Sequence, residues 1–196
     1  MAQKSSTSYV KDSIGLFEYY KKLGERAMAQ APDEALFAAL DKESNSIAII
    51  VKHMAGNMRS RWMDFLTTDG EKPDRNRDAE FEDAPRTRAE LVALWEKGWK
   101  HVFDALAPLT DADLTRQVTI RSEPHSVMQA ISRQLAHYAH HVGQIVFVAK
   151  HLTVVEKGKW ESLSVPRGKS AQINAQVAGG EVTHRTTLFG AKKSAS

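Results

Sequence analysis

The fold is decided by residues 126–152, SVMQAISRQLAHYAHHVGQIVFVAKHL. Ser126 and Gln129 form a capping-box pattern, which marks the start of a helix. Apolar residues then recur at helical spacing: Ile131, Leu135, Tyr138, Ile145 and Val148. The stretch therefore predicts a long helix with one apolar face, which has to be buried against other helices.

Three further segments show the same periodicity. They cover residues 8–31, ended by Pro32, residues 44–68, and the region from the capping box Thr87–Glu90 to about Pro108. Their expected core residues are Ile14, Phe17, Leu23, Met28, Ile47, Ile50, Met54, Met58, Phe65, Leu91, Leu94, Trp95, Val102 and Leu106. Four helices in 196 residues predict an all-α fold, an up-down four-helix bundle over residues 1–157. Little sheet is expected, with a short extended piece or hairpin at residues 116–121.

The connections and the C-terminal region differ in character. Residues 69–86 are highly charged and contain two prolines, so we expect a surface connection with a functional role. Residues 158–196 lack helical periodicity and predict a basic, irregular tail. Its apolar cluster suggests that residues 158–175 dock on the bundle: Trp160, Leu163, Val165 and Pro166. Beyond Gly179, the sequence offers only Leu188 and Phe189 as large apolar residues that could anchor the tail.

Composition excludes several classes of protein. The chain has no cysteine, which excludes disulfides, thiolate zinc sites and cysteine nucleophiles. The body is nearly neutral, with no basic stripe for nucleic acid, and no apolar run is long enough to span a membrane. The single Glu-x-x-His, Glu181 to His184, lies in the tail, which argues against a ferritin-like di-iron site. We expect a cytoplasmic protein that binds neither nucleic acid nor membrane.

Two histidines on the fourth helix lie one turn apart. His137 and His141 share the face of Ile145 and Val148, whereas His140 points away from it. Two neutral imidazoles at this spacing can bind one divalent ion. A hydrogen-bonded or exposed pair is the alternative, and by itself the pair favours that alternative.

His53 on the second helix adds a third imidazole. Its face also carries Ser46, Asn57, Ser60 and Asp64, beside the apolar stripe. This strip is either an ordinary solvated edge, which the residues alone slightly favour, or the position of a third metal ligand. Three protein ligands would leave coordination positions open for water and substrate.

The pattern of His53 followed by His137-x-x-x-His141-x-Gly143-Gln144 resembles the DinB/YfiT-like superfamily of metalloenzymes. Residues 44–82, SNSIAIIVKHMAGNMRSRWMDFLTTDGEKPDRNRDAEFE, and the later WESLSVPRGKSAQIN resemble a bacterial subfamily labelled as a domain of unknown function. The resemblance covers about residues 8–175. It implies a four-helix bundle, a divalent metal (zinc or nickel) bound by His53, His137 and His141, and a homodimer. Many relatives have an arginine where this chain has Val142, which removes a charge beside the site.

The resemblance also implies an activity, because some relatives are thiol-dependent S-transferases. The expected function is thus a metal-dependent enzyme that acts on a small-molecule thiol or an electrophilic substrate. Asn57 is expected to orient the substrate or a ligand, Gln144 to hydrogen-bond a ligand, and Asp64 to lie further along the strip. For each of the three, a purely structural role is equally expected. The alternatives are a non-catalytic metal-binding or stress-response protein and a bundle without metal.

Overall fold

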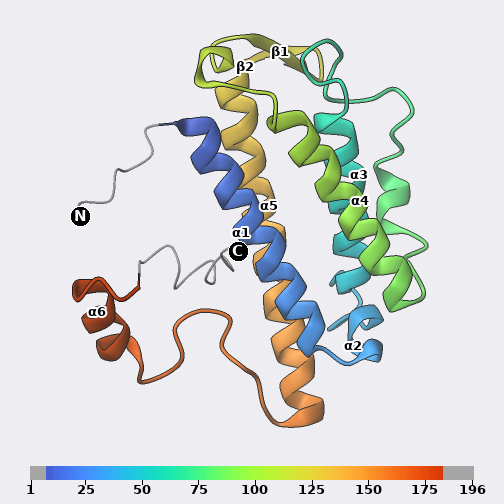
Figure 1. Ribbon diagram of the computed structural model, residues 1–196. Helices are drawn as coiled ribbons and strands as arrows, with labels where there is room; N and C mark the ends of the chain where they lie inside the picture. The colour runs from blue at the N-terminus through green and yellow to red at the C-terminus, as the bar shows by residue number, and fades with distance from the viewer. Residues whose placement is uncertain (1–7, 183–196) are drawn as a thin grey trace.

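Four long helices dominate the computed structural model, which describes residues 8–182 (Figure 1). They are α1 (Tyr9–Gln30), α3 (Ile47–Trp62), α4 (Arg88–Leu106) and α5 (Val127–Lys157). All four lie where the apolar periodicity predicts them, although α3 ends six residues early and α5 extends further. Residues His184, Leu188 and Phe189, considered above, lie outside the described part of the chain.

Shorter elements complete the mostly helical chain. They are α2 (Asp33–Phe37), α6 (Ser170–Ala178), the 3-10 turns η1 (Asp78–Phe81) and η2 (Asp111–Asp113), and strands β1 (Gln117–Ile120) and β2 (Glu123–Ser126). The strands pair antiparallel, with Val118 opposite His125, so the expected hairpin exists and runs further than residue 121. Helix α6 corrects the prediction of a wholly irregular tail.

Side chains in the sequence set the helix ends. Ser46 accepts a hydrogen bond from the backbone N–H of Ile49 and so caps α3. Both predicted capping boxes are present, at Thr87 for α4 and at Ser126 for α5. Helix α5 ends at Gly158, whose φ of 68° is the left-handed conformation that glycine adopts without strain.

The order of the helices differs from the simple up-down arrangement that we expected. Helices α3 and α4 run in the same direction, and so do α1 and α5, with the two pairs antiparallel to each other (Figure 1). The reason is the connection between α3 and α4, which returns along the length of α3 before α4 begins. Part of this return segment, η1, packs against α3.

The core lies between the four long helices and is rich in aromatic rings. Phe17 of α1 packs against Trp62 of α3, Trp99 of α4 and Tyr138 of α5, with ring centroids 5.8–6.2 Å apart. Trp62, Trp95 and Trp99 are all buried, as expected for core residues. Within the described residues, no helix combines the length and apolar character needed to cross a bilayer.

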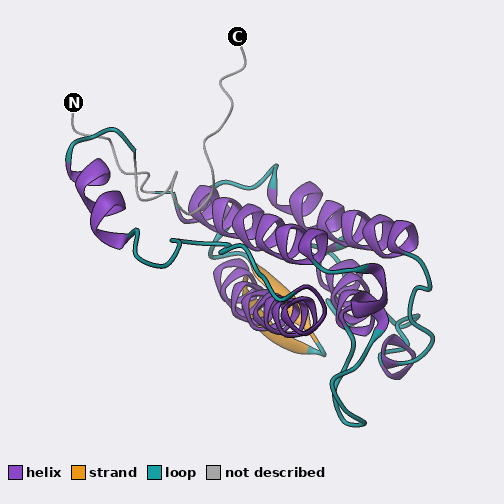
Figure 2. Cartoon of the chain, turned by 90° about the horizontal axis from the view of Figure 1, so that it is seen from below, coloured by secondary structure: helices purple, strands orange, loops and turns teal. Residues whose placement is uncertain are grey.

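The first part of the tail returns to α1. Leu163 is buried, its carbonyl oxygen accepts a hydrogen bond from Arg26, and Gln30 bonds the backbone of Glu161 in both directions. Helix α6 buries none of its residues and stands apart from the long helices in both views (Figures 1 and 2). The contacts with α1 are therefore made before α6 begins.

Candidate metal centre

Three histidines from two helices meet on one side of the α3–α5 contact. One ligand nitrogen from each of His53, His137 and His141 lies within 4.8 Å of the other two. The rings meet edge to face, with centroids 4.6–5.5 Å apart. The antiparallel crossing of α3 and α5 thus brings together the three residues singled out in the sequence, and His140 stays exposed beside them.

Two hydrogen bonds orient the imidazoles. Nδ1 of His53 donates to Oε2 of Glu80 over 2.9 Å, and Nδ1 of His141 donates to Oε1 of Gln144 over 2.8 Å. Since Nδ1 carries the proton in both rings, Nε2 keeps the lone pair that can bind a metal. Partners of this kind are typical of metal-bound histidines, where they set the tautomer and the ring orientation. Gln144 thus contacts His141, and its role beside a bound metal stays a prediction.

Glu80 is the important residue that sequence reasoning missed. It lies in η1, within the charged connection, yet it is only 6% exposed and also pairs with Arg75. A Cβ at Gly56 would come within 2.7 Å of the Glu80 carboxyl carbon, so any other residue there would require this carboxylate to shift from its contacts with His53 and Arg75. The signal in the sequence was that glycine, three residues after His53, together with an acidic residue in the next segment.

Burial keeps two of the three imidazoles, those of His137 and His141, neutral. Burial, reinforced by the neighbouring histidines, lowers the pKa of His137 to about 3. Burial and the nearby His53 and His140 lower the pKa of His141 to about 4, although Gln144 acts in the opposite direction. Burial alone would raise the pKa of Glu80, but hydrogen bonds from His53 and Arg75 hold it below its usual range. At neutral pH the site is therefore two neutral imidazoles beside an ionised carboxylate.

The three histidines open onto a cavity of about 370 Å³. Phe81 of η1 stacks on His53 at 4.8 Å between centroids and forms part of the wall, and the exposed His140 also lines it. A site with three protein nitrogens beside such a cavity leaves space for a small molecule.

Comparison with known families gives one match. Residues 4–169 match the model of a family described as a protein of unknown function, DUF1572. The chain belongs to this family. Neither the curated proteins nor the solved structures provided a match to it. The match agrees with the resemblance to a family of unknown function, and it assigns no activity to DUF1572.

Asn57, expected to orient a substrate or ligand, also lines the cavity of this DUF1572 chain. Its Oδ1 accepts hydrogen bonds from Gln134 and from the Tyr138 hydroxyl, which in turn accepts one from Trp62. Asn57 thus belongs to a buried polar network beneath the histidines. The burial of Ser46, His53, Asn57 and Ser60 shows that the reading of this strip as solvated was wrong.

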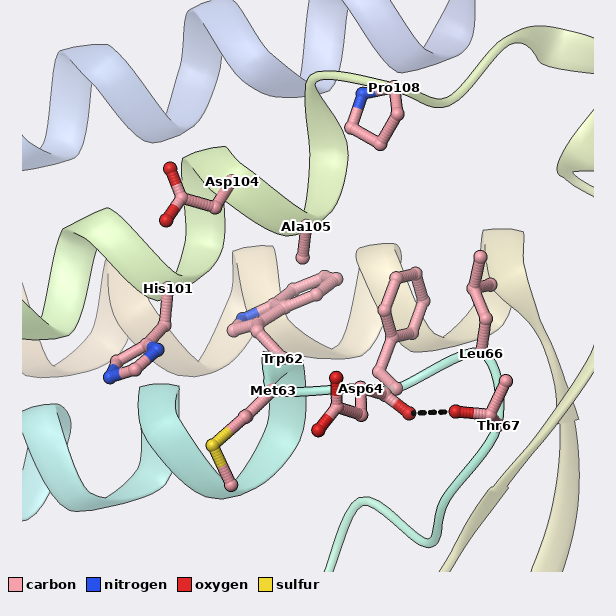
Figure 3. A pocket seen from close by; sticks show the side chains of 10 residues that line it. Trp62, Met63, Asp64, Leu66, Thr67, His101, Asp104, Ala105 and Pro108 are labelled. Atoms are coloured by element: carbon pink, nitrogen blue, oxygen red, sulfur yellow. Dashed lines mark hydrogen bonds between the residues drawn. The ribbon is translucent and has the colours of Figure 1, made fainter.

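Asp64 does not join the histidines. It follows the end of α3, adopts a positive φ of 50°, and lines a different cavity of about 440 Å³ between that end and α4. Figure 3 shows it there, where its backbone oxygen accepts a hydrogen bond from Thr67. The early end of α3 explains this position, because the helical face that was extrapolated from His53 stops at Trp62.

The donors of the DUF1572 site fit a divalent transition metal. Imidazole nitrogens suit zinc and nickel. Two nitrogens bound to one tetrahedral zinc ion lie about 3.4 Å apart, so nitrogens 4.8 Å apart have to approach by about 1.4 Å. Rotations about the side-chain bonds of the histidines can supply this movement. Nδ1 of His137, buried and without a hydrogen-bond partner among the described residues, leaves this ring less restrained than the other two.

Proposed function

We propose that the chain is a metal-dependent enzyme of the DinB/YfiT-like type, a four-helix bundle that binds zinc or nickel through His53, His137 and His141. The observation that carries the proposal is the convergence of three imidazoles, two of them held by outer hydrogen bonds, at a cavity. A purely structural ion is usually enclosed by four protein ligands. The open side favours catalysis over the alternative of a non-catalytic metal-binding protein.

The proposed reaction is the transfer of a small-molecule thiol to an electrophile. A divalent ion at the three imidazoles would lower the pKa of a bound thiol, which supplies a nucleophile at neutral pH. In the transfer a bond forms between the thiol sulfur and the electrophilic carbon. The leaving group departs with its bonding electron pair, and the thiol proton passes to solvent.

The chain's own residues would prepare the site for this reaction. Glu80 and Gln144 hold two of the rings with Nε2 toward the cavity, and Phe81 covers His53 from the side. The buried network of Asn57, Gln134 and Tyr138 fixes the floor between α3 and α5. These contacts pre-organise the ligands, so little rearrangement is needed when substrate binds. A homodimer, implied by the resemblance, stays a prediction.

Metal analysis of protein purified without a histidine tag tests the proposal. We expect one zinc or nickel ion per chain, lost on replacing His53, His137 or His141 by alanine and retained in His140→Ala. The loaded protein should accelerate the reaction of a low-molecular-weight thiol with a fluorogenic alkylating electrophile, and His53→Ala should not. A wild-type protein that binds no divalent metal would overturn the proposal.

A further inference from the structure

The wall of the cavity above the histidines is built largely from guanidinium groups. Five arginines line it, from α3, the α3–α4 connection, the hairpin turn and α5: Arg61, Arg75, Arg77, Arg121 and Arg133. None of the described residues that line the cavity is acidic. The cavity therefore carries positive charge even though Val142 stands where many relatives have an arginine.

Two of these arginines form ion pairs with glutamates that do not line the cavity. The side chains of Arg61 and Arg75 are 2–3% exposed and form ion pairs with Glu71, and Arg75 also pairs with Glu80. Burial alone would raise the pKa of Glu71, but hydrogen bonds from Arg121 and Arg61 lower it to about 2. This carboxylate therefore stays charged. The inner pair, Arg61 and Arg75, thus belongs to the framework, although Nε of Arg61 is buried with no hydrogen-bond partner in the described part of the chain.

The other three arginines form the rim of the cavity and have donors to spare. Arg133 makes no ion pair among the described residues and donates only to the neutral Gln134. Arg77 lies over the Phe81 ring, and its nearest carboxylate, Asp78, is 97% exposed and 4.0 Å away. Arg121 uses Nε to reach Glu71, and its terminal nitrogens make no hydrogen bond to the residues that the structure describes.

The position of Arg121 is costly for the backbone. Arg121 and Ser122 both have positive φ, 55° and 63°, in the two-residue turn of the hairpin, where glycine or asparagine is usual. The Asp69 carboxylate accepts hydrogen bonds from the backbone N–H groups of both residues and so holds the turn. Strain that is retained by dedicated contacts is typical of functional positions.

From this arrangement we propose that the rim arginines Arg77, Arg121 and Arg133 bind a carboxylate or phosphate group of a small anionic substrate. Guanidinium groups bind such planar or tetrahedral oxyanions through paired, charge-assisted hydrogen bonds. The cavity size and the histidines at its floor favour a small molecule whose other end reaches them. The inference rests on the proposed function for the identity of this molecule as the substrate, since it names the substrate class of the same site.

Calorimetric titration of the metal-free protein with inorganic phosphate and with succinate tests the anion site. We expect both to bind, and the uncharged succinamide not to bind. Arg77→Gln and Arg133→Gln should each weaken binding about tenfold, the effect of losing one charge-assisted contact. Arg86→Gln is the matched control, because Arg86 is exposed and carries the same charge outside the cavity. The Arg86→Gln protein should bind both anions as tightly as the wild type does. Preference for phosphate or for succinate then tells which oxyanion the site is built for.

Two results separate this inference from the proposed function. His141→Ala should lose metal and still bind phosphate, whereas Arg133→Gln should keep metal and lose phosphate affinity. Metal binding without any anion binding by the wild type, or equal weakening in Arg86→Gln, would overturn the anion site alone. Anion binding by a wild type that takes up no metal would leave the arginine rim standing and overturn the metalloenzyme.

Discussion

Nδ1 of His53 on α3 lies 2.9 Å from Oε2 of Glu80 in η1, and both side chains are buried. The two residues are separated by 27 positions, and the contact depends on the connection returning along α3. It orients the ring of His53, a proposed metal ligand, and places a negative charge behind it. The same carboxylate also pairs with Arg75, so a single side chain joins the proposed metal site to the arginine wall.

Replacement of Glu80 by glutamine should weaken metal binding by about 10–100-fold, the usual effect of losing an outer partner of a ligand. The amide keeps the shape of the side chain but removes the charge that makes His53 a better donor. Competition with a chromogenic chelator measures the change. Glu82→Gln, an exposed acid two positions on, should bind metal as tightly as the wild type. Equal metal affinity in both variants would mean that Glu80 pairs with Arg75 but does not strengthen metal binding by His53.

The low pKa values of His137, about 3, and His141, about 4, predict how the metal-free protein responds to acid. In the unfolded chain both residues titrate near 6.5. Between about pH 6.5 and 4 the unfolded chain therefore takes up protons that the folded chain refuses, and stability falls as pH falls. Thermal melting of metal-free protein from pH 7 to 4 should show this loss, and His137→Gln should show a shallower one. Superimposable pH profiles for the two proteins would contradict the assignment.

The same values change the expected pH range of metal binding. From the ordinary histidine pKa, proton competition would begin near pH 6.5. For His137 and His141 it begins only near pH 4, because burial already keeps them neutral above that. Protonation of His137 and His141 should therefore not weaken metal binding between pH 7 and pH 5.5. Metal titrations at these two pH values test this.

Gly56→Ala should damage both the fold and the site. The added methyl group would overlap the Glu80 carboxylate, and such overpacking typically costs about 1–3 kcal/mol. Gly143→Ala is a matched control, because it lies two residues after His141 in a helix and its Cβ would meet nothing within 4 Å. There alanine should stabilise the helix by up to about 1 kcal/mol. In urea unfolding the two variants should shift in opposite directions, and metal content should fall only in Gly56→Ala. Unchanged metal content in Gly56→Ala would contradict the role given to Glu80.

Leu163→Ala should lower stability by about 2 kcal/mol, the lower end for a buried leucine, since it sits at the edge of the fold. Ile173→Ala, in the half-buried face of α6, should change stability by much less because α6 buries no residue. Urea unfolding compares the two. Similar small effects would show that the tail does not depend on its Leu163 anchor.

Helical periodicity and spacing were sufficient to predict the four long helices and both capping boxes, and to place His137 and His141 on one face. The grouping of His53 with these two came from the family resemblance. The relative directions of the helices could not be predicted in this way, because an apolar stripe can pack against a parallel or an antiparallel neighbour. The burial of His53 was also hidden, since its own face of α3 is polar and becomes buried only when η1 covers it. Glu80 and Lys72 were missed for the same reason: charged residues in a connection predict solvent exposure, yet these two are 6% and 7% exposed.

The parallel course of α3 and α4 has a consequence for how such a protein can diversify. A chain that reverses direction at every helix needs only tight turns, whereas this one must include a crossing segment as long as α3. That obligatory segment carries Glu80, Phe81 and Arg77, while the three histidines stand on the helices. Changes in length or composition of the crossing segment can therefore alter what the cavity accepts while the imidazoles stay in place. Protein engineers could therefore replace the crossing segment, which forms one wall of the cavity, and leave the three histidines unchanged.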